Sequence, residues 1–361
     1  MPIILQGLLI SLLAAALSLL VYFPLRRLAI RRNILNDQDA REFRRKPEPI
    51  LGGLAVYTGF FAGIFLLFSI QGTPRMLVAF LSLTLIMLIG MWDDIRSLPV
   101  AFRFNLELIV VWALMYFGQF YINDLHGVWG IHEMSPLIAA PLSIFIGVNI
   151  IRAFNLIGGV DGYCAGIVVL SCLLFSLPLF TVGDYAPAFC LLILAGAVVP
   201  FLLNNVLGKH SQMFLGNAGT LLLGLSMTIA VFYILYSGTP HDEFEEQDFG
   251  VLAYTLAVLC IPIFDSLRMM ARRLFKGESS AMQSKKLLHH LFIESGFSHV
   301  GTSVTIMLMN LVVVLIWWIS WKLGATVTWQ FYIVVIIGTL VTTVFPDVLL
   351  ALRKKHMRRP E

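Results

Sequence analysis

Long apolar segments, separated by short polar ones, follow one another along the whole chain. Most have about 20 residues, the length that an α-helix needs to cross a lipid bilayer. They lack the strict alternation of apolar and polar residues that is typical of membrane β-strands. Because lipid tolerates only helices and closed barrels, the pattern predicts an all-α polytopic membrane protein, one domain over 1–361. We expect about eleven spans, over roughly 3–24, 50–70, 75–91, 103–121, 136–154, 163–181, 187–205, 215–237, 250–268, 301–321 and 328–352.

The composition agrees with this fold class. Hydrophobic residues make up 58% of the chain and charged residues 13%, with a mean hydropathy of +0.86. Globular proteins have about 25% charged residues, so no large soluble domain fits in the chain. The first span has no basic region before it and no nearby cleavage site, so we expect it to stay as a membrane helix. All four cysteines fall in predicted spans without metal-ligand spacing, and they carry no information about redox chemistry.

Lys and Arg residues lie almost entirely on one side of the predicted topology. All 25 except Arg75 and Lys322 belong to that side. By the positive-inside rule it is cytoplasmic, which places the N-terminus outside and the C-terminus inside. The predicted outer loops 122–135 and 238–249 contain no Lys or Arg. The net charge of +4 therefore reflects topology and attraction to anionic membrane lipids, and it does not indicate nucleic-acid binding.

Two adjacent acidic residues, Asp93 and Asp94, come at the end of the third predicted span. Neighbouring carboxylates at a lipid boundary repel each other and are costly to desolvate unless a cation neutralises them. A hard divalent ion such as Mg²⁺ prefers oxygen ligands and commonly accompanies a phosphate substrate. The simpler interpretation is that the pair marks the water interface at the end of a helix.

A second polar segment, residues 149–162, closes the fifth predicted span on the same side. Its glycines interrupt the helix and bring backbone amides within reach of an anionic ligand. Asn155 and Asp161 add an amide and a carboxylate at the membrane boundary. An ordinary turn between two helices is the competing explanation, because Asn, Gly and Asp all favour turns.

A third polar segment, residues 204–220, leads into the eighth predicted span. Small residues flank Asn217, so its oxygen can lie in a tight turn or at a helix N-terminus, which favours phosphate. Alternatively, Asn217 or Thr220 is only the N-cap of that helix.

The longest predicted cytoplasmic loop, residues 269–300, combines five Lys and Arg residues with the pair His289-His290. Basic residues in such a loop ordinarily bind lipid phosphates or follow the topology rule. Imidazole is more specific, since it can donate to a phosphate or bind a metal. Just before the loop, Asp265 and Arg268 form either an interfacial ion pair or part of the same pocket.

The order of these motifs resembles a known family. Asp93-Asp94, the segment from Asn155 to Asp161, Phe-Leu-Gly-Asn-Ala-Gly at 214–219, Pro-Ile-Phe-Asp at 262–265 and His289-His290 follow one another. This arrangement is similar to the polyprenyl-phosphate N-acetylhexosamine-1-phosphate transferases of glycosyltransferase family 4. It is more similar to the eleven-span branch that acts on N-acetylglucosamine.

The resemblance implies an activity and its partners. The expected substrates are undecaprenyl phosphate and a UDP-N-acetylhexosamine, the product is UMP, and the cofactor is Mg²⁺ with Mn²⁺ as a substitute. The expected location is the bacterial inner membrane, among membrane lipids, where the reaction initiates cell-envelope glycan synthesis. A homodimer is left open.

Site residues follow from the same resemblance. It implies catalytic roles for Asp93, Asp94 and Asp161, and metal binding by Asp93, Asp94 and Asn217. Substrate binding is expected from Asn155, Arg152, Arg268, Lys285, His289 and His290.

Six positions named here depart from the family pattern. Arg152 stands where the family has an Asn, and Thr220 stands where it has a Ser. Gly158 and Asn217 each stand where the family has an Asp. The Asp normally found at position 217 is a main Mg²⁺ ligand in the family. In the loop motif, an Asp and the first His are replaced, by Ser284 and Leu287 respectively.

These departures bear on activity. Losing carboxylates is expected to weaken Mg²⁺ binding, while Arg152 adds a cation that can partly replace a metal in holding diphosphate. A rival hypothesis is therefore a non-catalytic family member that binds polyprenyl phosphate or a partner enzyme. A transporter is disfavoured, because the ionisable residues gather at one boundary and not at the membrane midplane.

The predicted topology can be checked by cysteine labelling from outside intact cells, in a background with the four native cysteines replaced. Ser237→Cys is expected to react and Ser284→Cys to be protected, because of the distribution of Lys and Arg. The opposite pattern would place the predicted site on the outer face.

Overall fold

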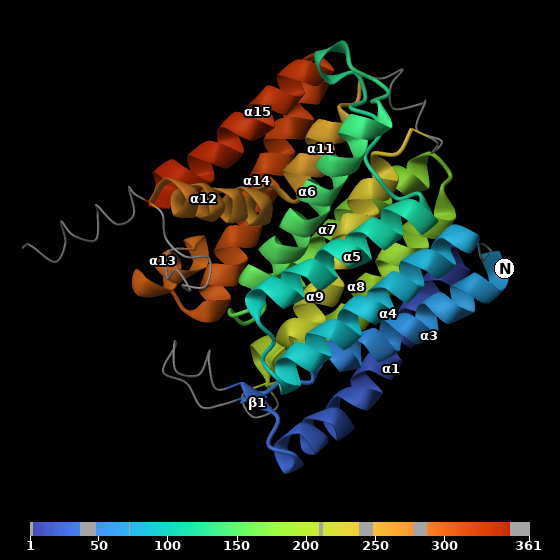
Figure 1. The fold of residues 1–361 in the computed structure, drawn as a ribbon, viewed down its shortest axis with the longest axis vertical. Helices are drawn as coiled ribbons and strands as arrows, with labels where there is room; N and C mark the ends of the chain where they lie inside the picture. The colour runs from blue at the N-terminus through green and yellow to red at the C-terminus, as the bar shows by residue number, and fades with distance from the viewer. Residues whose placement is uncertain are drawn as a thin grey trace, which may run out of the picture.

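Apolar helices of membrane-span length form most of the computed structural model, which describes residues 3–36, 48–71, 73–208, 212–237, 248–276 and 287–346 (Figure 1). Ten described helices have the length and composition of spans, and a bent pair supplies an eleventh. The all-α polytopic fold predicted from the sequence is thereby confirmed. The ten are α1 (Ile3–Arg31), α3 (Gly52–Gln71), α4 (Pro74–Ile95), α5 (Val100–Gly118), α6 (Pro136–Leu156), α7 (Tyr163–Thr181), α8 (Tyr185–Leu207), α9 (Gly216–Ile234), α14 (His299–Lys322) and α15 (Val327–Thr339, continued by a π-helical turn, Leu340–Val344).

Helix α9 lies at the centre of the bundle and is the most buried of the ten spans. It packs against α3, α4 and α6. Glycines make the first two contacts close. A Cβ added to Gly90 of α4 would lie 2.5 Å from the Cα of Ala218, and one on Gly53 of α3 would lie 2.3 Å from the backbone nitrogen of Gly219. Small residues let membrane helices approach in this way, so α3 and α4 are held against the first turn of α9.

A short hairpin fixes the chain that leads into α9. Strand β1 (Leu35–Asn36) pairs antiparallel with β2 (Glu48–Pro49). Immediately before α9, the N–H of Phe214 donates to the carbonyl of Pro49 over 2.7 Å, and the N–H of Gly53 donates to the carbonyl of Leu215 over 2.9 Å. The start of α9 is therefore bonded to the start of α3.

The ninth span is broken, which differs from the continuous helix predicted over 250–268. Helix α11 (Val251–Val258) ends, and α12 (Cys260–Lys276) continues at 78° to it. Pro262 has no N–H to give to the carbonyl of Val258, so the helical bonding pattern fails here.

Asn310 of α14 satisfies the backbone groups released at this break. Its Nδ2 donates to the carbonyl of Val258 over 2.9 Å, and its Oδ1 accepts from the N–H of Ile261 over 3.0 Å. Asn310 is 0% exposed. Non-helical backbone at membrane depth is tolerated only where such partners exist.

Helix α12 runs across the direction of the other helices and lies next to α13 (Leu288–Glu294) (Figure 1). Its Ser266 hydroxyl donates to Oδ1 of Asn149 in α6 over 3.3 Å. Leu274 and Phe275 on its outer side are exposed, whereas Asp265 is buried. The segment 269–300, predicted as a loop, thus begins with helix and contains a further helix.

Replacing Asn310 with Leu keeps its volume but leaves the groups at the helix break without partners. We expect Asn310→Leu to lower the free energy of unfolding by about 1–3 kcal/mol, the usual cost of an unsatisfied buried polar group. Thermal unfolding of the detergent-purified protein measures this. Asn105→Leu, at an exposed position of α5, is the matched control. Equal stability of the two variants would contradict the bridging role of Asn310.

Candidate functional site

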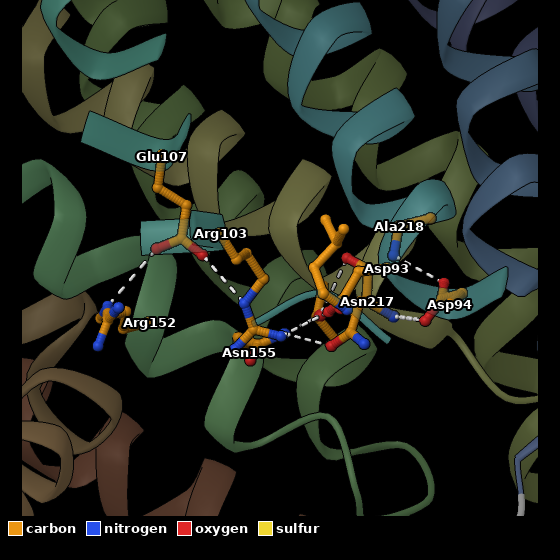
Figure 2. Close-up of polar contacts among 10 residues, drawn as sticks. Asp93, Asp94, Arg103, Glu107, Arg152, Asn155, Asn217 and Ala218 are labelled. Atoms are coloured by element: carbon orange, nitrogen blue, oxygen red, sulfur yellow. Dashed lines mark hydrogen bonds and ion pairs between the residues drawn. The ribbon is translucent and has the colours of Figure 1, made fainter. Parts of the chain in front are cut away.

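The carboxylate of Asp94 joins the end of α4 to the start of α9. It accepts hydrogen bonds from the backbone N–H of Asn217 over 2.8 Å and from that of Ala218 over 3.0 Å (Figure 2). Gly216, at the start of α9, has a φ of +74°, and a Cβ there would lie 2.5 Å from Asp94 Oδ2. Gly90 lies one turn before Asp94 on the same face of α4 and allows the approach. Asp94 therefore satisfies two free amides of the α9 N-terminus.

Asn155, near the end of α6, adds a third helix to this junction. Its Nδ2 lies 2.9 Å from both Asn217 Oδ1 and Thr220 Oγ1. The structure thus brings Asp94, Asn155 and Asn217, which are far apart in sequence, to one end of the bundle, where α4 and α6 finish and α9 begins. We call this end the site end.

Asp93 belongs to a chain of alternating charges. Its Oδ2 lies 2.6 Å from Nη1 of Arg103, and its Oδ1 accepts from the N–H of Leu98 over 2.7 Å. Arg103 Nε lies 3.5 Å from Oε1 of Glu107, whose Oε2 lies 3.5 Å from Nε of Arg152. In Figure 2, Glu107 lies between the two arginines.

Glu107 and Arg103 are site residues that the sequence reasoning missed. Both fall inside the predicted span 103–121, where Glu107 was counted as part of an apolar run. The Glu107 side chain is only 2% exposed. A signal was present, because an acidic residue within a span, one helical turn from a basic one, is a candidate functional group by default.

Asp161 lies in the turn between α6 and α7. Hydrogen bonds with α14 and α8 hold this turn in place. Its carbonyl accepts from the hydroxyl of Ser303 in α14 over 2.7 Å, and the next N–H, of Gly162, donates to Oδ1 of Asn205 in α8 over 2.7 Å. Gly162 has a φ of +76°. The side chain of Asp161 is largely buried and lines a cavity of about 10 Å³, together with Gly158. That is room for about one water molecule.

The remaining predicted residues that the structure describes form a second group at α12 and α13. Arg268 Nη2 lies 2.5 Å from Oδ1 of Asp265, whose Oδ2 accepts from the N–H of Leu288 over 2.9 Å. The ion pair lies within α12, and the hydrogen bond from Leu288 attaches α13 to it. Lys285 and Ser284 lie outside the described residues.

His289 is buried within this second group. Its ring lies 5.9 Å from that of Tyr163 and 4.2 Å from that of His290, measured between centroids. Burial, reinforced by the neighbouring imidazoles of His290 and His299, holds the pKa of His289 well below its usual value. Its ring is therefore neutral at pH 7 and packs as part of the interior.

In the described structure, each predicted magnesium ligand is bonded to groups of the protein. Their oxygens are of the hard type that Mg²⁺ prefers. However, the oxygens of Asp93 are bonded to Arg103 and Leu98, and those of Asp94 to the amides of α9. Asn217 Oδ1 is bonded to Asn155. Within the described ranges, no group of three or more His, Cys, Asp or Glu side chains is arranged to hold a metal.

Two departures from the family pattern occupy the same space. A Cβ added to Gly158 would lie 2.5 Å from Cγ2 of Thr220. The threonine cannot turn away freely, because its hydroxyl accepts from Asn155 and donates to the carbonyl of Asn217 over 3.3 Å. The Thr220 methyl therefore occupies the space that a side chain at position 158 would need.

The chain is similar to several known proteins. Residues 76–236 match the family model described as glycosyl transferase family 4. The chain is 27% identical to undecaprenyl-phosphate alpha-N-acetylglucosaminyl 1-phosphate transferase of Escherichia coli K12, over 78% of this chain and 74% of that protein. It is 26% identical to decaprenyl-phosphate N-acetylglucosaminephosphotransferase of Mycobacterium tuberculosis, over 81% and 76%. It is also 26% identical to a probable undecaprenyl-phosphate N-acetylglucosaminyl 1-phosphate transferase of Bacillus subtilis, over 84% and 82%.

The steric conflict between positions 158 and 220 predicts a specific rescue. Gly158→Asp alone should lower the free energy of unfolding by about 1–3 kcal/mol through overpacking. Thr220→Ser removes the methyl but keeps the hydroxyl, so the double variant should be more stable than Gly158→Asp. A double-mutant cycle from thermal unfolding, with Thr220→Ser alone as the control, measures the coupling. Additive effects would show that the two positions do not compete for space.

Proposed function

Because the chain belongs to glycosyl transferase family 4, we propose that it transfers N-acetylhexosamine 1-phosphate from a UDP-sugar to undecaprenyl phosphate and releases UMP. The relatives named above are polyprenyl-phosphate N-acetylglucosamine-1-phosphate transferases, which favours N-acetylglucosamine as the sugar. The proposed location is the cytoplasmic face of a bacterial inner membrane, and the proposed role is the first step of cell-envelope glycan synthesis.

The observation that carries this proposal is the junction of α4, α6 and α9 at the site end. Asp94, Asn155 and Asn217 meet there through direct hydrogen bonds. The reaction needs such a place, because a prenyl tail remains in the bilayer while a hydrophilic nucleotide arrives from water. Polar groups at the ends of spans serve both substrates.

In the proposed reaction, an oxygen of the lipid phosphate attacks the phosphorus that carries the sugar. The bond between that phosphorus and the oxygen of UMP breaks, and UMP leaves with the bonding electrons. A phosphate monoester has a second pKa of about 6, so it is already ionised at pH 7. The protein then contributes mainly alignment and neutralisation of charge.

Residue roles follow from position and charge. The exposed part of Arg152 is suited to a phosphate group, and the amides of Asn155 and Asn217 to orienting polar substrate groups. Asp161 supplies a carboxylate at the turn between α6 and α7. His289 is buried and neutral, so its proposed part is to support α13 and not to contact phosphate directly.

A second function is favoured by a specific observation. Thr220 occupies the space of a carboxylate side chain at position 158, and Asn217 provides an oxygen without charge. A protein that binds polyprenyl phosphate or a partner enzyme without turnover would need neither carboxylate.

Release of UMP distinguishes the two functions. Purified protein is incubated with undecaprenyl phosphate and a panel of UDP-N-acetylhexosamines, with Mg²⁺, Mn²⁺ or a chelator. We expect release from the N-acetylglucosamine donor, and a fall of about 100-fold or more in Asp161→Asn, as for other lost charge-stabilising groups. Glu133→Gln, at an exposed position of the opposite end, should behave as wild type. No UMP from any donor under any condition would leave the non-catalytic function.

A further inference from the structure

We propose that Arg103 and Arg152, held by the buried carboxylate of Glu107, bind the phosphate groups of the ligand here and that no divalent cation is needed. The inference rests on the proposed function only in taking a phosphate ester as the ligand. It concerns how that ligand is bound, whether or not it reacts.

The acidic pair already has bonded partners within the protein. Arg103 pairs with Asp93 over 2.6 Å, and the N-terminal amides of α9 pair with both oxygens of Asp94. Adjacent carboxylates attract a divalent ion when they lack such partners. At these positions, a metal ion would have to compete with a guanidinium and with a helix terminus.

Arg152 is held on one side and exposed on the other. Its Nε faces Glu107, and its guanidinium carbon lies 4.3 Å from the centre of the Phe104 ring. Its side chain is 37% exposed, whereas its Nε is buried. A planar guanidinium fixed on one edge, with its other edge open, is suited to bidentate binding of phosphate. Arg273 lies near enough to add to the positive potential.

Glu107 lies between the two arginines. Its two oxygens face Nε of Arg103 and Nε of Arg152, each over 3.5 Å. Within the described residues Oε2 has no hydrogen-bond donor, although Glu107 is almost fully buried. A buried carboxylate is costly without cationic neighbours, so Glu107 and the two arginines hold one another in place. Glu107 is thus a positioning residue.

The described charges at the site end are mixed. Two guanidiniums, of Arg103 and Arg152, lie among three carboxylates, those of Asp93, Asp94 and Glu107. Phosphate binding therefore depends on the exposed part of Arg152 and not on an excess of positive charge.

The test is phosphate binding by the detergent-purified full-length protein in excess chelator. The probes are undecaprenyl phosphate, UMP and inorganic phosphate, so that lipid and nucleotide sources are distinguished. We expect at least one phosphate ester to bind equally well with chelator and with Mg²⁺. Arg152→Asn should weaken that binding by about 10-fold to 100-fold, the range for a lost hydrogen bond to a charged group. Arg96→Asn, at an exposed position outside the network, is the matched control.

The role of Glu107 is tested by coupling. If Glu107 acts through the arginines, Glu107→Gln should weaken binding in the wild-type background and add little to Arg152→Asn. Equal losses in both backgrounds would mean that Glu107 is only structural.

A gain of metal dependence provides a further test. Asn217→Asp places a second carboxylate beside Asp94 without a new cation. Mg²⁺ should therefore raise the melting temperature of Asn217→Asp and leave that of the wild type unchanged.

The inference is overturned if chelator abolishes wild-type phosphate binding and Mg²⁺ restores it. If phosphate binding and UMP release both require Mg²⁺, the proposed reaction is upheld and this inference is not. Metal-independent binding without UMP release would uphold the inference alone.

Discussion

The two hydrogen bonds from the first amides of α9 to Asp94 determine much of what surrounds them. A helix that starts inside a membrane protein has free N–H groups, and these need acceptors more than they would in water. Asp94 supplies them from α4, and Gly90 and Gly216 leave the space that this requires. Once α4 is fixed against α9, Asn155 can bridge α6 to the same turn. Arg103, which follows on α5, can then reach Asp93.

Much of the architecture could be predicted from the sequence, because span length and charge asymmetry are strong signals. The polar segments around Asp93, Asn155 and Asn217 do lie together, as their common position at span ends indicates. The break in the ninth span was harder to predict from the sequence. Pro262 indicates a weak point, but the bend also depends on Asn310, which lies in another helix and is visible only in three dimensions. Glu107 was missed because one charged residue hardly changes the hydropathy of a span.

The interpretation of Asp93 and Asp94 shows where reasoning from composition reaches its limit. Two neighbouring carboxylates do need compensation at a lipid boundary, and that part of the argument holds. The sequence alone does not identify the protein groups that bond to them. These are the guanidinium of Arg103, ten residues later, and a backbone amide of α9, over a hundred residues later.

The contact between Thr220 and position 158 also limits the order in which this protein diverged from its family. If an ancestor had Asp and Ser at these positions, the methyl group of Thr220 would have been better tolerated after the aspartate was lost. With threonine in place, return of the aspartate is sterically unfavourable. Recovery of the carboxylate is then easier after a change at Thr220, a residue that has no acid–base chemistry of its own.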